Sequence, residues 1–295
     1  MNARDYALVV LVCTVWGFNF VAGAKGMQAF SPLLFMSIRF GILLLVVLPF
    51  MRPPPPGQWT RLAGASLFVG ALHFTAMFWA LKLSSDVTSI ALLQNMYVPF
   101  SVLLAILLLG ERAGWRTLLA TAVAFSGVLV IGFDPLVLNQ PAALALILLS
   151  ALLQATGSVF MRGLYGLGPI SFQGWTAVFS LPVVLLATLV FENDQLATMA
   201  TAGAVHWAAL LYSVFFASLV GHGLFFFLVQ RHPLPMLMPY MLLAPLLATA
   251  FGVLVWGDRP GWRLVTGGAL VLSGILFITL RGRARALSAR VGESA

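Results

Sequence analysis

Three side chains that could bind or carry charge lie inside long apolar stretches of this sequence: Arg39, His73 and His222. Ionisable residues are rare in hydrocarbon, and those present usually line a cavity or pair with other polar groups. A guanidinium binds carboxylates through two parallel hydrogen bonds, and an imidazole accepts, donates or carries a proton. The three residues therefore favour recognition of a small anion or zwitterion. As alternatives, Arg39 extends to the surface or bonds carbonyls and Asp86, and each histidine simply joins two helices.

Neutral hydrogen-bonding residues and large aromatic rings occur in the same stretches, several of them at helical spacing. Two pairs are three positions apart and one pair is four positions apart, so the members of each pair share a helix face. Together they describe a mostly apolar, aromatic-rich pocket suited to a small zwitterionic or amphipathic solute, although each ring alone is also consistent with packing. With the three residues above, they complete the predicted substrate-binding set: Trp16, Asn19, Gln94, Tyr97, Gln154, Ser158, Trp175 and Tyr240.

Catalysis is not expected. The sequence has no set of nucleophile, base and orienting group, no phosphate-binding loop and no ligand cluster at metal spacing, so we predict no catalytic residue, metal or cofactor. Cys13 is the single cysteine, which excludes an intramolecular disulfide and a cysteine-built metal site. The acidic residues fall at segment ends or in loops, which leaves histidine as the available proton carrier: Asp5, Asp86, Glu111, Asp134, Glu192, Asp194, Asp258 and Glu293.

The elements that must hold these residues are helices in a membrane. Of 295 residues, 61% are hydrophobic and 8% are charged, and the mean hydropathy is +1.02, unlike a soluble domain. Because lipid satisfies no backbone hydrogen bond, apolar segments of this length are expected to be helical. We predict an all-α polytopic membrane protein with ten transmembrane helices near residues 6–24, 32–51, 62–81, 86–109, 115–133, 141–161, 169–191, 206–229, 234–256 and 262–280.

The first of these segments is expected to remain a helix. Ala22-Gly23-Ala24 resembles a signal-peptidase site after an apolar run. The run is nevertheless long enough to span a bilayer, and it contains residues of the predicted site. We therefore do not interpret it as a signal peptide.

The net charge of +8 is interpreted as a topology signal rather than as nucleic-acid binding. With the N-terminus on one side, that side carries eleven basic residues, and the other side carries only Lys25, Lys82, Arg259 and Arg263. Because cytoplasmic loops are enriched in arginine and lysine, both termini are predicted to be cytoplasmic. The basic end of the chain is expected to rest on anionic headgroups. The eleven are Arg4, Arg52, Arg61, Arg112, Arg116, Arg162, Arg231, Arg281, Arg283, Arg285 and Arg290.

One stretch of the sequence occurs twice. Gly110–Arg116 returns 147 positions later as Gly257–Arg263, and the same offset carries Ser126-Gly127 onto Ser273-Gly274. Such self-similarity predicts a duplicated unit, here residues 1–134 and 135–281, followed by a basic cytoplasmic tail at 282–295. Since five helices per unit is an odd number, the second unit enters the membrane inverted. Inverted repeats of this kind favour alternating access around a central cavity.

Small and helix-breaking residues recur at matching places in the two units. Pro99 and Pro245 fall in the middle of the fourth and ninth segments, and we predict that they act as hinges, although membrane helices also tolerate proline for packing alone. The glycines of the repeated stretch indicate a tight turn, with its tryptophans in the headgroup layer. Small residues at four-residue spacing, such as Ala120/Ala124 and Ala244/Ala248, predict close helix packing.

Four short motifs carry a resemblance to a known family: Trp16–Phe20, Arg39-Phe40, Gly110-Glu111 and Gly257-Asp258. With these motifs, and in its length, the chain resembles an EamA-type member of the drug/metabolite transporter superfamily. Aspartate at 258 departs from the usual glutamate. Among the branches, the YddG-type amino-acid exporters are similar in length and aromatic content.

The resemblance implies a carrier that alternates between inward-open and outward-open states. For bacteria it implies export of small metabolites, here amino acids including aromatic ones, across the inner membrane. The expected partners are the solute and the bilayer, without nucleic acid, and a monomer is plausible. The alternatives are a membrane-embedded enzyme or lipid-handling protein that uses His73, His222 and Arg39, or a channel.

Overall fold

The computed structural model describes residues 3–109, 114–161, 164–231, 240–241 and 243–293, and no strand occurs among them. The predicted all-α organisation is confirmed. The helices of the first half are α1 Ala3–Met27, α2 Pro32–Val47, α3 Trp59–Ser66, α4 His73–Leu83, α5 Val87–Gln94, α6 Tyr97–Leu109 and α7 Trp115–Gly132. Those of the second half are α8 Pro135–Leu138, α9 Pro141–Met161, α10 Pro169–Phe191, α11 Gln195–Thr201, α12 Ala204–Tyr212, α13 Gly223–Arg231, α15 Leu243–Phe251 and α16 Trp262–Glu293.

Seven helices in the described part of the chain are long and apolar enough to cross a membrane: Ala3–Met27, Pro32–Phe50, Trp59–Leu83, Val87–Leu108, Pro141–Met161, Pro169–Phe191 and Ala204–Phe225. Three shorter apolar helices run over Leu118–Ile131, Leu243–Trp256 and Trp262–Phe277. Each of the predicted segments overlaps one of these helices. Helix α16 continues past the predicted end of the last segment, so the basic end of the chain extends the helix as far as Glu293.

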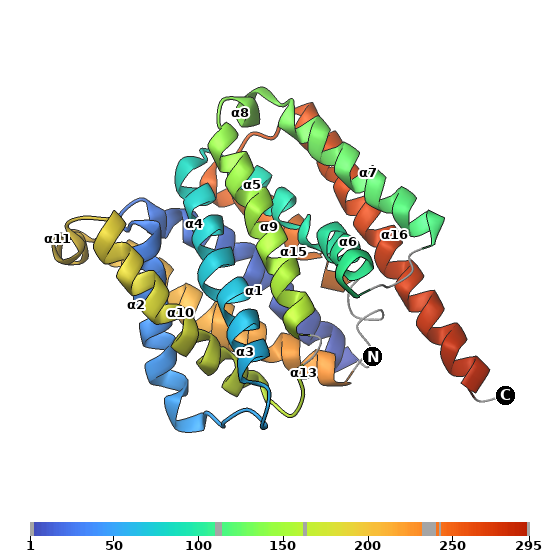
Figure 1. Cartoon of the computed structure of the whole chain (residues 1–295). Helices are drawn as coiled ribbons and strands as arrows, with labels where there is room; N and C mark the ends of the chain where they lie inside the picture. Colours follow the sequence, from blue (N-terminus) through green and yellow to red (C-terminus); the bar gives the residue numbers. More distant parts are fainter. Residues whose placement is uncertain (1–2, 110–113, 162–163, 232–239, 242, 294–295) are drawn as a thin grey trace.

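Helices α7 and α16 run side by side along one edge of the molecule, whereas α2 and α10 pack together on the opposite side (Figure 1). At the α7–α16 crossing, equivalent residues of the two halves of the chain make the same contacts. A Cβ atom on Gly127 would meet the backbone of Gly267 and Val271 at 2.6 and 2.7 Å. A Cβ on Gly274 would meet the backbone of Ala120 and Ala124 at 2.6 and 2.8 Å. At the 147-residue offset Gly127 corresponds to Gly274, Ala120 to Gly267 and Ala124 to Val271, so the two sets of contacts are reciprocal, and the predicted close packing at Ala120/Ala124 is confirmed.

The contacts of α1 in the first half of the chain resemble those of α9 in the second half. Helix α1 packs against α15 and against α12 with the segment that follows it, and α9 packs in the same way against α5, α6 and the α3–α4 helix. Gly17 of α1 lies against Ala244 and Ala248 of α15, which confirms the close packing predicted there. The small side chains allow these backbones to approach each other.

Three helices in the part of the chain that the structure describes contain π-helical segments. They are Leu67–Leu72 between α3 and α4, Ser213–His222 between α12 and α13, and Gly252–Trp256 after α15. The first two correspond at the 147-residue offset. π-Helical turns widen a helix and are frequent at functional sites. Here the first segment immediately precedes His73, and the second ends at His222.

The fourth apolar segment is interrupted, as the position of Pro99 predicts. Helix α5 ends at Gln94 and α6 begins at Tyr97. Proline has no N–H to donate to the carbonyl of Asn95 four residues earlier, and this carbonyl instead accepts from the N–H of Val98 at 3.1 Å. Pro245 is buried in the first turn of α15. Residue 242, just before α15, lies outside the described residues.

Two carboxylates cap helices that belong to the other half of the chain. Asp258 accepts from the N–H of Val87 at 3.3 Å and from the N–H of Thr88 at 2.8 Å, at the first turn of α5. Glu192 accepts from the N–H groups of Leu33 and Leu34 at 3.0 and 2.9 Å, at the first turn of α2. Each carboxylate satisfies helix N–H groups that have no partner within the helix, and its charge opposes the positive end of the helix dipole.

The turn predicted around the second repeated stretch is confirmed at Gly257. This residue adopts φ +87°, in the left-handed region that favours glycine. Residues 110–113 of the first stretch lie outside the described residues. The tryptophans that follow, Trp115 and Trp262, are about 70% exposed, and each lies beneath its neighbouring arginine, with the guanidinium carbon 5.3 and 5.4 Å from the ring.

Candidate functional site

A buried polar cluster joins three helices in the middle of the bundle. Nδ1 of His73 on α4 lies 2.8 Å from the hydroxyl and 3.1 Å from the main-chain carbonyl of Ser150 on α9. The same hydroxyl lies 3.0 Å from Oε1 of Gln94 on α5. Nε2 of Gln94 in turn donates to Oε1 of Gln154, one turn along α9, at 2.7 Å. Three residues predicted from the sequence are therefore connected through Ser150, which the sequence interpretation did not include.

Arg39 lies deep in the bundle, with 2% of its surface exposed. Its Nη2 donates to the hydroxyl of Ser218 at 3.0 Å, and its guanidinium carbon lies 4.1 Å from the centre of the Phe74 ring. Nε has no hydrogen-bond partner, and within the described part of the chain no carboxylate pairs with Arg39. Asp86 instead accepts from Ser89. The structure therefore contradicts two alternatives for Arg39, extension to the surface and pairing with Asp86.

Arg39 and His222, the third predicted ionisable residue, both lie near the ring of Phe74. The ring of Trp16 lies 4.9 Å from the ring of His222, and the ring of Phe74 lies 6.4 Å from the ring of His222. Nε1 of Trp16 donates to the carbonyl of Ala217 at 3.2 Å, within the π-helical segment that ends at His222. The guanidinium of Arg39 and the imidazoles of His73 and His222 therefore lie among aromatic rings.

Asn19, Tyr97 and Ser158 make contacts outside this cluster. Oδ1 of Asn19 accepts from the Ser213 hydroxyl at 2.6 Å, which ties α1 to the π-helical segment of the second half. Tyr97 begins α6 directly after the helix interruption and packs against the main core. The hydroxyl of Ser158 is half-buried and donates to its own helix, at the carbonyl of Gln154.

Two predicted residues lie away from the cluster. Nε1 of Trp175 donates to the carbonyl of Arg52 at 2.8 Å, and its ring lies 4.9 Å from that of Trp59, near the start of α3. The hydroxyl of Tyr240 lies 3.4 Å from that of Tyr6, in the first turn of α1. Both residues were predicted from residue type alone, as large rings with a polar group, and residue type carries no information on depth in the bundle.

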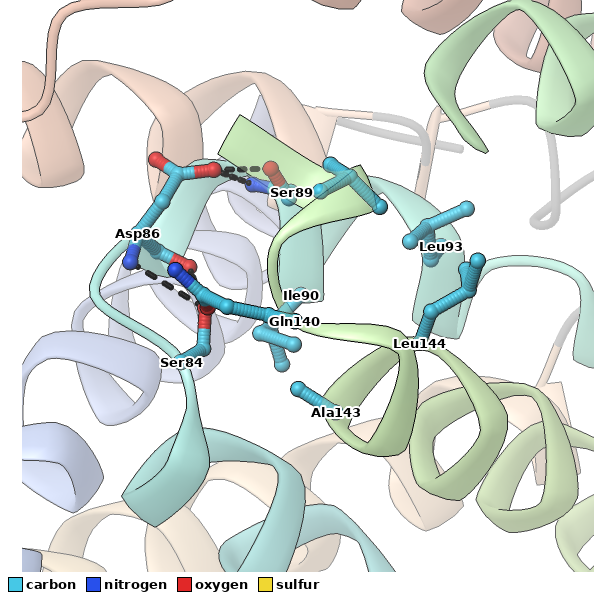
Figure 2. Close-up of a pocket in the computed structure, with 9 residues that line it drawn as sticks. Ser84, Asp86, Ser89, Ile90, Leu93, Gln140, Ala143 and Leu144 are labelled. Carbon is cyan, nitrogen blue, oxygen red and sulfur yellow. Dashed lines mark hydrogen bonds between the residues drawn. The ribbon is translucent and has the colours of Figure 1, made fainter. Parts of the chain in front are cut away.

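A second polar group lines a small cavity at one end of the bundle (Figure 2). Asp86 caps α5 through the N–H and hydroxyl of Ser89, the hydroxyl of Ser84 accepts from the N–H of Asp86, and Gln140 donates to the hydroxyl of Ser85. The cavity holds about 10 Å³, which is room for about one water molecule. Burial, and next the charge of Asp258, raise the pKa of Asp86 to about 6. The cavity is too small for a metabolite.

Among the described residues, no group of three histidine, cysteine or carboxylate side chains could hold a metal ion. The chemistry on offer is hydrogen bonding and charge recognition without a nucleophile. These properties suit reversible binding of a polar solute.

Comparison with known proteins identifies the family. The profile of the EamA-like transporter family matches residues 4–133 and 141–280. The chain belongs to the EamA-like transporter family. As an EamA-family protein it is a multi-pass membrane transporter of small-molecule solutes, not an enzyme, which confirms the family resemblance of the sequence.

Several EamA-family relatives extend over the whole chain. A "Probable amino-acid metabolite efflux pump" of Salmonella typhimurium is 28% identical and covers 99% of both chains. The protein of the same description from Escherichia coli (strain K12) is 27% identical over 99% of this chain and 100% of its own. The "Biotin transporter" of Escherichia coli (strain K12) is 23% identical over 92% of each chain. A solved crystal structure superposes with a TM-score of 0.64 at 18% identity, covering 96% of this chain and 99% of its own, which shows a shared fold.

Proposed function

We propose that this protein exports amino acids, including aromatic ones, across the bacterial inner membrane by alternating access. The observation that carries the proposal is Arg39, a buried guanidinium without a carboxylate partner in the described structure. A buried cation is costly unless something neutralises it. An amino-acid carboxylate would supply that charge through two parallel hydrogen bonds.

The surroundings of Arg39 support the substrate class. Phe74 and Trp16 offer aromatic faces, and the cluster at Gln94 and Gln154 offers neutral hydrogen-bonding groups. Full-length relatives described as amino-acid metabolite efflux pumps support the same class. Biotin is the second candidate, because a relative carries that name and biotin also presents a carboxylate to Arg39.

The proposed mechanism rocks two inverted five-helix repeats about the central cluster, with ten helices spanning the membrane. The reciprocal contacts at the α7–α16 crossing and the paired contacts of α1 and α9 support this symmetry. In such a transporter the same packing serves two poses, each open to one side. The interruption between Gln94 and Tyr97 would let α5 and α6 bend at Pro99, and Pro245 is the corresponding hinge of the second repeat.

Both termini are proposed to be cytoplasmic, on the charge asymmetry of the loops. The single Cys13 is buried, so a cysteine-free background requires one substitution. Single cysteines at exposed residues Trp59 and Leu196 then report sidedness in intact cells. A membrane-impermeant thiol reagent should label L196C and spare W59C, and the reverse pattern would overturn the orientation.

Transport itself is tested by counterflow in proteoliposomes. Purified protein is reconstituted, loaded with one unlabelled amino acid and offered the same labelled amino acid outside, across a panel that includes biotin. A carrier gives saturable accumulation driven by the internal solute, whereas a channel, enzyme or lipid-handling protein does not. Accumulation of biotin alone would replace the amino-acid proposal, and no counterflow with any solute would refute the carrier.

A further inference from the structure

The position of the proton on His73 follows from its contacts. Nδ1 lies 3.1 Å from the main-chain carbonyl oxygen of Ser150. A carbonyl oxygen only accepts hydrogen bonds, and its identity does not depend on how an amide side chain is turned. Nδ1 must therefore carry a hydrogen and donate it to Ser150.

The Ser150 hydroxyl strengthens this assignment. It lies 2.8 Å from Nδ1 of His73, 3.0 Å from the carbonyl of His73 and 3.0 Å from Oε1 of Gln94. The hydroxyl has one hydrogen and two lone pairs. If Nδ1 donates to it, the hydroxyl gives its one hydrogen to either Oε1 of Gln94 or the His73 carbonyl, and no contact places two donors against each other. Ser150 is fully buried, so water does not compete for these bonds.

The opposite nitrogen is thereby fixed as an acceptor. In a neutral imidazole with hydrogen on Nδ1, Nε2 presents a lone pair. Nε2 of His73 has no hydrogen-bond partner among the residues that the structure describes. The ring of His73 lies 4.6 Å from the ring of Phe74, and the guanidinium of Arg39 lies against the same phenyl ring. An acceptor and a cation thus flank one aromatic side chain.

We propose that Ser150 is a positioning residue that fixes His73 in the Nδ1–H form, so that Nε2 accepts a hydrogen bond from the ammonium group of the substrate. The substrate carboxylate pairs with Arg39, and the side chain lies over Phe74. The inference rests on the proposed function and narrows it, since it selects zwitterions over carboxylic acids that lack an amino group. Ser150 acts only through His73.

The first test needs no substrate. Protein labelled with ¹⁵N in its histidine rings is examined by NMR at mildly alkaline pH, with His73→Gln identifying the His73 signals. The expected spectrum of the intact chain has a protonated Nδ1 and a bare Nε2 for His73. Ser150→Ala removes the hydroxyl at 2.8 Å but keeps the main-chain carbonyl at 3.1 Å, so the excess of the Nδ1–H form should become smaller without disappearing. Hydrogen on Nε2 in the unsubstituted protein would overturn the proposal, even if Ser150→Ala fails to fold.

The second test measures selectivity. Counterflow of L-phenylalanine is inhibited with unlabelled L-phenylalanine or with 3-phenylpropanoate, which lacks only the amino group. One lost hydrogen bond to a charged group corresponds to about a tenfold change, so His73→Phe, which removes Nε2, should reduce the preference for phenylalanine about tenfold. Ser150→Ala, which weakens the Nδ1–H preference but keeps the carbonyl acceptor, should reduce it by a smaller, measurable factor. Thr156→Ala is the matched control, because its exposed hydroxyl bonds only to Leu152 of the same helix.

Failure of the positioning role of Ser150 and failure of the proposed transport function give different results. A selectivity unchanged by Ser150→Ala would refute the positioning role while leaving amino-acid transport intact. If the unsubstituted protein shows no phenylalanine counterflow, the proposed function fails instead. The histidine spectrum then decides the tautomer assignment by itself, since the hydrogen on Nδ1 is a property of the protein without solute.

Discussion

The carboxylate of Asp258 accepts two hydrogen bonds of 2.8 Å from Thr88, one from its main-chain N–H and one from its hydroxyl. The residues are 170 positions apart, and they join the turn before α16 to the first turn of α5. Aspartate replaces the glutamate usual in EamA-type sequences at this position. The shorter side chain is buried and serves as a helix cap, which gives that carboxylate a structural role.

Removing the Asp258 charge should destabilise the protein. In Asp258→Ala the N–H groups of Val87 and Thr88 lose their acceptor, which corresponds to about 1–2 kcal/mol of unfolding free energy. The measurement is thermal unfolding in detergent. Asp194→Asn is the control, because Asp194 is exposed and makes no side-chain cap bond, and asparagine tolerates its left-handed backbone at φ 58°. Equal melting temperatures for the two variants would contradict the capping role.

Stability should rise when the pH falls from 7 toward 4. The pKa of Asp86 is raised to about 6 in the folded protein, by burial and by the charge of Asp258, against an ordinary value of 3.8. A raised carboxyl pKa contributes stability that is complete below the unfolded value and is lost as the pH rises through about 6. A shift of this size corresponds to at most about 3 kcal/mol.

Asp86→Asn separates this effect from other titrations. Asparagine remains a good helix cap and does not ionise, so the variant should be more stable than the parent at pH 7, with a flatter pH dependence of the melting temperature. A pH profile identical to that of the parent chain would show that Asp86 does not titrate in this range.

Substitution of Arg39 should abolish most transport. Arg39→Gln keeps a polar group of similar length but removes the charge, and loss of a charged hydrogen bond corresponds to about a ten- to hundredfold change. Counterflow at limiting solute concentration should fall by that factor. Arg116→Gln, at an exposed position on α7, should leave counterflow unchanged. Normal transport by Arg39→Gln would place the carboxylate-binding group elsewhere.

Collapse of the pH gradient should leave the counterflow rate unchanged. In the described structure no carboxylate contacts Arg39, and His73 bonds to Ser150 and not to an acid. Proton-coupled carriers commonly keep such a titrating pair within the membrane. The measurement compares uptake with and without a protonophore, and a large drop with the protonophore would assign a proton-carrying role to one of the histidines.

The predictable part of the fold was what local sequence dictates. Apolar segment length located the helices, and the missing N–H of Pro99 located an interruption. Repetition at 147 residues identified equivalent positions such as Gly127 and Gly274, which the structure brings into reciprocal contacts. The π-helical segments were not predicted, because they depend on packing between helices and leave no periodic pattern.

The candidate site was also predictable only in part. Residue type located Arg39, His73, Gln94 and Gln154, but not which of them meet. Ser150 was missed although it precedes Gln154 by one helical turn, so extending the four-residue spacing from Ser158 through Gln154 would have found it. Trp175 and Tyr240 share the chemistry of the cluster, and only their depth in the bundle separates them from it.

A single alanine at the α7–α16 crossing should be disruptive. In Gly127→Ala the new methyl group meets backbone atoms at less than 3 Å, so the helices must separate, at about 1–3 kcal/mol. Gly41→Ala is the control, because no atom lies within 4 Å of a Cβ there. Thermal unfolding of both variants checks the prediction, and a destabilised Gly41→Ala with an intact Gly127→Ala would contradict it.

The reciprocal contacts of α7 and α16 have the geometry of an isologous interface, in which residue i meets j and the equivalent of j meets the equivalent of i. That is the arrangement by which two identical subunits form a dimer. The chain therefore contains, within one polypeptide, the kind of surface that joins two copies of a protein in a homodimer. In a homodimer one substitution alters both sides of such an interface at once, whereas in this chain Gly127 and Gly274 can be substituted independently.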